Sequence, residues 1–141
     1  MEAGTHIIFD ALMCPYRIGE RVRALRLLRS LTTGMLLMWD RGLHSYAMVQ
    51  ATVAKGCDYL GRIPANVKFF GEKPLDDGSY LSSIYPSGKL RKIGCQPILV
   101  RVIEYTIEHP DNPEEQLTYR LISCRVVGEG IPSAMGSRKY H

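Results

Sequence analysis

The spacing of apolar residues changes at Gly56, and this change constrains the fold more than any other feature of the chain. Before Gly56, two short apolar segments, 5–12 and 35–39, each precede a segment with helical periodicity, 17–31 and 46–55. Strands and helices that alternate in this way predict an α/β layer. The unbroken apolar run at 35–39 is typical of a strand buried on both faces.

The two predicted helices carry recognisable end signals. Between residues 17 and 31, apolar positions three apart form one stripe and arginines occupy the remaining surface. Gly34 suits the end of this helix because glycine tolerates the left-handed conformation. Ser45 is a favoured residue type for the N-cap of the second helix, and Gly56 closes it.

After Gly56 the pattern predicts strands only, and we expect no helix between residues 57 and 127. Strand signals occur at 58–63, 66–70, 79–85, 98–108 and 116–127, separated by turns at 76–78 and 86–89 and a proline-containing loop at 109–115. The chain therefore divides into an α/β segment 1–56, a β-rich segment 57–127 and an irregular tail 128–141.

Length and composition limit the classes of protein to be considered. The 141 residues allow one packed core, and 45% hydrophobic with 23% charged residues argues against wholesale disorder. The apolar runs are too short for a membrane span, and no basic, apolar leader is visible, so we expect no membrane partner and a cytoplasmic location. The four cysteines are widely spaced, which favours reduced thiols over a zinc site.

Charge is distributed in blocks. The net charge of +4 permits a polyanionic partner without requiring one. Residues 17–29 contain five arginines and one acid, residues 55–101 contain eight basic residues and four acids, and residues 104–115 contain five acids and no base. Such blocks are commonly solvated faces, so charge alone does not decide between that interpretation and a binding surface.

Asp40 is the strongest candidate for a functional residue. It directly follows the apolar segment 35–39 and precedes Arg41 and Gly42. The carboxyl ends of strands in α/β sheets face the ligand crevice, and a carboxylate there can hold Mg²⁺. The alternative is that Asp40 caps the next turn and forms a surface ion pair with Arg41.

A series of short motifs along most of the chain gives Asp40 its context. They are Gly4-Thr5-His6, Cys14-Pro15-Tyr16-Arg17, the run from Gly34 through Trp39-Asp40-Arg41-Gly42 to Tyr46, Asp58-Tyr59-Leu60-Gly61-Arg62-Ile63, Asp77-Gly78-Ser79-Tyr80-Leu81, Val102-Ile103-Glu104-Tyr105-Thr106 and Tyr119-Arg120-Leu121-Ile122. In this order, the motifs resemble the DDE-type transposases of bacterial insertion sequences, specifically insertion-sequence family four. The resemblance covers about residues 4 to 124.

The resemblance implies an α/β (α+β) fold, with a partial ribonuclease-H-like core in 1–56 followed by an antiparallel β-rich insertion in 57–127. In the family, three carboxylates hold two Mg²⁺ or Mn²⁺ ions, which promote cleavage and strand transfer at transposon DNA ends. Asp40 matches the second aspartate of that triad, as a catalytic and metal-binding residue. Arg41 and Gly42 match the residues that accompany it.

The other two carboxylates of the family are not matched. The first belongs upstream of the Gly4 motif, and the last belongs to a Tyr-Arg-Glu pattern that residues 128–141 lack. Asp10 and Glu129 are not substitutes. We therefore expect a transposase fragment that is inactive alone, in which segments 5–12 and 35–39 have lost strand neighbours and expose their edges.

Several basic residues are close to aromatic residues in the sequence, and they form a second set of candidate DNA contacts. Phosphate contacts combined with aromatic stacking would suit a DNA end. We predict DNA-binding roles for Arg41, Arg62, Lys68, Lys89, Arg91 and Lys92, and the alternative for this set is a solvated surface. Tyr105 and Tyr119 are in strand-like alternation and favour cross-strand packing.

Three functions remain open from the sequence. The chain is an enzyme fragment that retains DNA affinity and would lie with the nucleoid when bound, or a non-catalytic binding module, or a product without a selected role. As a binding module it would pair with a second copy or with full-length transposase and interfere with it.

Overall fold

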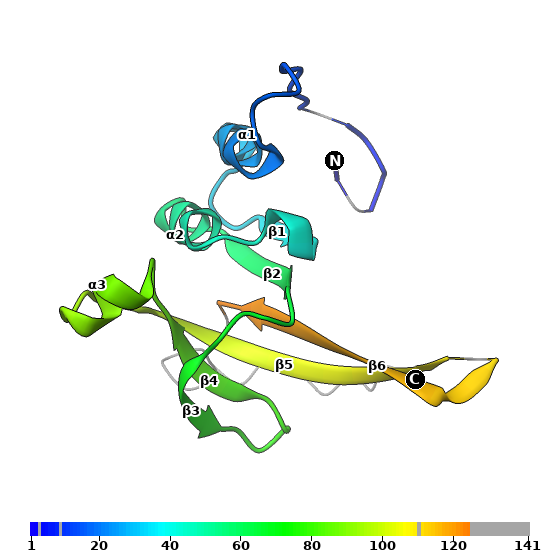
Figure 1. Ribbon diagram of the computed structural model, residues 1–141. Coiled ribbons are helices and arrows are strands. Elements are labelled where there is room, and N and C mark those ends of the chain that lie inside the picture. Colours follow the sequence, from blue (N-terminus) through cyan, green and yellow to red (C-terminus); the bar gives the residue numbers. More distant parts are fainter. Residues whose placement is uncertain (3, 9, 110, 125–141) are drawn as a thin grey trace.

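One six-stranded mixed sheet forms the body of the molecule (Figure 1). The computed structural model describes residues 1–2, 4–8, 10–109 and 111–124. The strands follow the order β1-β2-β6-β5-β4-β3 across the sheet. Their bounds are β1 Leu36–Trp39, β2 Asp58–Ile63, β3 Phe70–Pro74, β4 Tyr80–Ile84, β5 Ile98–His109 and β6 Asn112–Ser123, and the helices are α1 Glu20–Leu27, α2 Tyr46–Ala54 and α3 Gly88–Lys92.

A strand–helix–strand unit forms one side of this sheet. β1 and β2 pair in parallel, and α2 connects them. The predicted cap is confirmed, because the Ser45 hydroxyl accepts the Met48 N–H at 3.1 Å. Gly56 follows α2 with a φ of 69°, a conformation that glycine adopts at low cost. The predicted mixture of helices and strands is thus confirmed, and the boundary at residue 56 lies inside the β1–α2–β2 unit.

The remaining pairings are antiparallel, and the two longest strands, β5 and β6, extend beyond their neighbours. The last residue of β2, Ile63, pairs with Arg120, and the first residue of β4, Tyr80, pairs with Val102. Beyond these points β5 and β6 pair only with each other. Residues 105–109 and 111–119 therefore form a two-stranded extension, called the arm below, which projects from the sheet in Figure 1.

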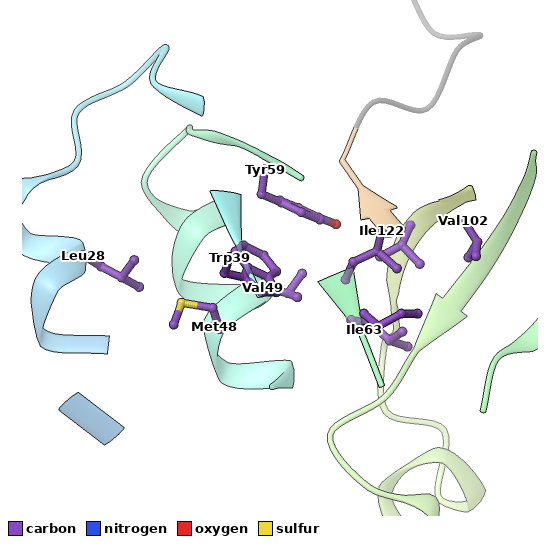
Figure 2. Close-up of a cluster of buried hydrophobic side chains, with 10 residues drawn as sticks. Leu28, Trp39, Met48, Val49, Tyr59, Ile63, Val102 and Ile122 are labelled. Atoms are coloured by element: carbon purple, nitrogen blue, oxygen red, sulfur yellow. The ribbon is translucent and has the colours of Figure 1, made fainter. Parts of the chain in front are cut away.

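Burial distinguishes the two faces of the sheet. The register places Tyr59, Ile122 and Val102 on one face, and all three are buried. α2 packs against this face, as Figure 2 shows for Met48 and Val49 beside Trp39. The full core consists of Leu28, Trp39, Met48, Val49, Tyr59, Ile63, Ile84, Val100, Val102 and Ile122. The opposite face carries half-buried and exposed side chains.

The loop between β2 and β3 is held across the sheet by Arg120. The Arg120 Nη2 donates to the carbonyl oxygens of Pro64, Ala65 and Val67 at 3.0, 2.5 and 3.0 Å. The same guanidinium lies 5.3 Å from the centroid of the Phe69 ring. One side chain therefore donates to three carbonyls of this loop, in addition to the Val67 N–H that the Pro64 carbonyl accepts at 3.2 Å.

The prediction of a strand at 5–12 is wrong for its described residues, and Phe9 lies outside them. His6 has a φ of 60°, which is incompatible with extended backbone. Asp10 instead joins this segment to the 3₁₀ turn Leu28–Ser30 that follows α1, through the Arg29 Nη2 at 2.8 Å and the Ser30 hydroxyl. The Arg29 and Ser30 hydrogen bonds lower the pKa of Asp10 to about 2. A β-rich composition forms no strand without a neighbour to pair with.

The expectation that segment 35–39 is buried on both faces is also wrong. β1 is the first strand in the sheet order, so among the described residues no strand pairs with its outer edge. Leu36 and Met38 are 58% and 54% exposed, whereas Trp39 on the other face is buried. The exposed edge predicted for this segment is confirmed.

Three further expectations differ from the structure. The strand expected at 66–70 begins only at Phe70, because the preceding residues form the loop held by Arg120. The turn expected at 86–89 initiates α3, which a Ser87 cap stabilises, so the region after 57 does contain a helix. β6 begins at Asn112, inside the loop expected at 109–115. Residues 125–127 of the last predicted strand, and the tail 128–141 with Glu129, lie outside the described residues.

Candidate nucleic-acid interface

Asp40 follows the last residue of β1 and precedes the 3₁₀ turn Arg41–Leu43. Its side chain is 71% exposed and makes no capping hydrogen bond to that turn. The ion-pair partner is Arg62, whose Nη1 lies 3.5 Å from the Asp40 Oδ1. The capping interpretation and the expected pairing with Arg41 are therefore wrong, because β2 places Arg62 beside the aspartate.

Arg62 also contacts the base of the arm. Its guanidinium lies 4.4 Å above the centroid of the Tyr119 ring, and Tyr119 stacks on Tyr105 at 5.3 Å. Tyr105 and Tyr119 are directly opposite in the β5–β6 register, so the predicted cross-strand packing is confirmed. Asp40, Arg62, Tyr119 and Tyr105 together form what we call the Arg62 cluster.

A contact from α1 supports the turn after Asp40. The Arg21 Nε donates to the Gly42 carbonyl at 2.9 Å. His44, two residues after Gly42, is half-buried. Its burial, together with the nearby charge of Arg21, lowers the pKa of its imidazole. Sequence reasoning missed this support because Arg21 is distant from the turn in the chain and resembles the other arginines of its block.

A second group of predicted residues surrounds α3. Lys89, Arg91 and Lys92 are exposed on this short helix. The Arg91 guanidinium lies 3.9 Å from the centroid of the Phe70 ring. Lys68, also exposed, precedes Phe70 by two residues. These four cations, Lys68, Lys89, Arg91 and Lys92, are called the α3 basic group below.

The strand directions place these two groups at opposite ends of the sheet. β6 runs antiparallel to β2, β5 to β6 and β4 to β5, so β2 and β5 run the same way. The carboxyl ends of β1 and β2, with Asp40 and Arg62, consequently share one end with the arm. α3 joins the end of β4 to the start of β5 at the other end. The structure therefore brings Arg62 near Asp40 but separates Lys89, Arg91 and Lys92 of α3 from it.

The residues near Asp40 do not fit the two-ion centre that the resemblance implies. Among the described residues, no three His, Cys, Asp or Glu side chains are grouped so that they could hold a metal ion. Asp40 itself faces a guanidinium at 3.5 Å, which competes for its oxygens. Paired Mg²⁺ or Mn²⁺ ions need several carboxylates, because one offers little against the hydration of the ion.

No protein family, curated protein or solved structure that was compared with the chain matches it. The described part of the chain also has no helix that is both long and apolar enough to cross a membrane.

Proposed function

We propose that this chain is a transposase-related DNA-binding protein that binds DNA through the α3 basic group and does not cleave it on its own. The ordered motifs around Asp40 support the relationship. So does the place of Asp40 at the carboxyl end of a parallel strand, in a strand–helix–strand unit compatible with a partial ribonuclease-H-like core. An antiparallel region compatible with the β-rich insertion follows.

The observation that carries the DNA-binding proposal is the exposure of three cations on α3 and of Lys68, with the Arg91 guanidinium placed over the Phe70 ring. Lys89, Arg91 and Lys92 extend from a helix that is capped by the Ser87 hydroxyl, which accepts the Leu90 N–H at 3.2 Å. Phe70 supports the Arg91 guanidinium from one side, at 3.9 Å from the ring centroid. A guanidinium held in this way can still donate hydrogen bonds to phosphate oxygens from its edge.

The Arg62 cluster explains why we propose binding without turnover. Its single carboxylate is already paired with Arg62, so the charge needed to hold two cations is missing. A transition state with extra negative charge on phosphate would lack most of its stabilisation there.

A second candidate function is pairing with a full-length transposase, which the free edge of β1 favours. An apolar groove of about 780 Å³ lies beside this strand, with Leu31, Leu36 and Met38 among its lining residues. Strand addition to an exposed edge is a general mode of protein association.

The DNA-binding proposal is tested by fluorescence anisotropy with a labelled duplex at two salt concentrations. We expect weak binding with a log–log salt slope of about −3 to −5, from about 0.9 per neutralised phosphate. The variant Lys89→Glu/Lys92→Glu should lose most of this affinity. Arg17→Glu/Arg26→Glu carries the same charge change on the segment that contains α1 and should retain binding.

Two results would contradict the proposal. One is the absence of binding at low salt, and the other is an equal loss of affinity in both charge-reversed variants, which would indicate that only net charge matters.

A further inference from the structure

The backbone of β1 has an outer edge that borders the apolar groove. The Asp58 N–H of β2 donates to the carbonyl of the residue before β1 at 2.9 Å. In the alternating ladder of a parallel pair, the backbone groups of Leu37 and Trp39 therefore point toward β2. Those of Leu36 and Met38 point outward, next to the groove of about 780 Å³. The edge thus offers donors and acceptors to a further strand.

The N-terminal segment lines the same groove. Met1, Glu2 and Ile7 contribute to its lining together with Leu36 of β1. Ile7 and Leu36 are each 58% exposed, and the neighbouring Ile8 is 70% exposed. Both β1 and the N-terminal segment therefore bring exposed apolar side chains to a groove that they leave unfilled. Burying these side chains against each other would be favourable.

A local turn keeps the N-terminal segment out of the extended conformation. The His6 N–H donates to the Glu2 carbonyl, and the Glu2 N–H donates to the Ile7 carbonyl, both at 2.9 Å. The Thr5 hydroxyl donates to the Glu2 carboxylate. His6 adopts a φ of 60°, which is unfavourable for a residue with a Cβ. Extension of His6 would relieve this cost.

An anchor just beyond the turn holds the segment beside β1. Asp10 accepts hydrogen bonds from the Arg29 Nη2 at 2.8 Å, from the Arg29 Nε at 3.1 Å and from the Ser30 hydroxyl. The Met35 N–H donates to the Thr32 carbonyl at 3.1 Å, and this turn places the anchor near the start of β1. A segment that leaves the anchor along the edge would therefore run antiparallel to β1.

We propose that residues 4–8 form a strap that switches between this turn, the open state, and an added strand on the outer edge of β1, the closed state. In the closed state the strap is extended and antiparallel to β1, and its backbone pairs with that of Leu36 and Met38. Five extended residues span about 17 Å, enough to cover the four residues of β1, which span about 13 Å. Alternate side chains of the strap then fill the groove.

This device goes beyond the proposed function and depends neither on DNA nor on a transposase partner. A closed strap occupies the β1 edge, so a strand from any partner would have to displace residues 4–8. The strap would therefore regulate association at this edge from within the chain. It does not include any residue of the α3 basic group.

Two substitutions of one residue test the strap by shifting its equilibrium in opposite directions. His6→Gly removes the cost of the positive φ and should favour the open state. His6→Val makes that φ unfavourable and extended backbone favourable, so it should favour the closed state. The ratio of closed to open states should differ between these variants by roughly 5–30-fold. Met13→Val, at a side chain that is 98% exposed beyond the anchor, is the control and should equal wild type.

Amide hydrogen exchange measured by NMR reports closure at single residues. The Leu36 and Met38 amides should exchange more slowly in His6→Val than in His6→Gly, because the closed strap pairs with them. The Leu37 and Trp39 amides are the internal reference, since they point toward β2 in both states. Nile red, a neutral apolar dye, should bind more weakly to His6→Val, in which the strap fills the groove.

A further variant tests the anchor. Asp10→Ala added to His6→Val removes the hydrogen bonds from Arg29 and Ser30. The strap then loses its attachment near β1, and its effective concentration at the edge falls. Exchange of the Leu36 amide should accelerate toward the rate in His6→Gly.

Three outcomes would overturn the proposal. The first is equal exchange of the Leu36 and Met38 amides in His6→Gly and His6→Val. The second is an equal slowing at Leu37 and Trp39, which would indicate a general gain in stability, and the third is Nile red binding that does not differ between the variants. Circular dichroism confirms that each variant is folded. None of these measurements uses DNA, so failure of the strap is distinguishable from failure of DNA binding.

Discussion

At the scale of single residues, Gly61 determines how closely β2 approaches Trp39. A Cβ at position 61 would lie 2.2 Å from the Trp39 Cε2, and Trp39 is itself stacked on Tyr59 at 5.3 Å. The indole cannot retreat without disturbing this stack, so Gly61→Ala should lower the free energy of unfolding by about 1–3 kcal/mol. Urea unfolding measures the change. Gly42→Ala is the control, because a Cβ there would meet nothing within 4 Å. Equal midpoints for the two variants would contradict the expected steric conflict.

At the scale of elements, Arg120 on β6 positions the loop between β2 and β3. Arg120→Lys keeps the charge but cannot donate to the carbonyls of Pro64, Ala65 and Val67 from one planar group. We expect faster amide hydrogen exchange in residues 64–69 and a loss of about 1–3 kcal/mol in the free energy of unfolding, as for hydrogen bonds from a charged donor. Arg41→Lys on the exposed 3₁₀ turn is the control. Unchanged exchange in the loop of the Arg120 variant would show that its conformation does not depend on these bonds.

At the scale of the whole molecule, the sheet leaves Asp40 as an ordinary surface aspartate. Since it is 71% exposed and its ion pair with Arg62 spans 3.5 Å, Asp40→Asn should change the free energy of unfolding by less than about 0.5 kcal/mol. Millimolar Mg²⁺ should leave the Tm of both proteins unchanged, and wild type should neither nick DNA nor transfer strands with Mg²⁺ or Mn²⁺. A Mg²⁺-dependent rise in Tm that Asp40→Asn abolishes would reveal a metal site, and Asp40-dependent cleavage would reveal a complete active centre.

Much of the secondary structure was predictable from local signals. The helix expected at 17–31, which forms over the shorter range Glu20–Leu27, the Ser45 cap and the strand at 58–63 depend on interactions within a few residues. Their periodicity and end residues therefore indicate them directly. Predictions failed where a neighbour was decisive. Residues 5–12 have strand composition but no strand to pair with, and the loop at 64–69 is ordered by Arg120 from a distant part of the chain.

By itself, the sequence determined the mixture of helices and strands, the position of Asp40 after a strand and the basic and acidic blocks, because these are properties of adjacent residues. Only the tertiary structure decided which charged residues meet. Arg62 reaches Asp40 because β2 is parallel to β1, and α3 with Lys89, Arg91 and Lys92 is at the far end because β4 runs the opposite way to β2. Strand direction and register join residues that are far apart in sequence, and no local pattern encodes that pairing.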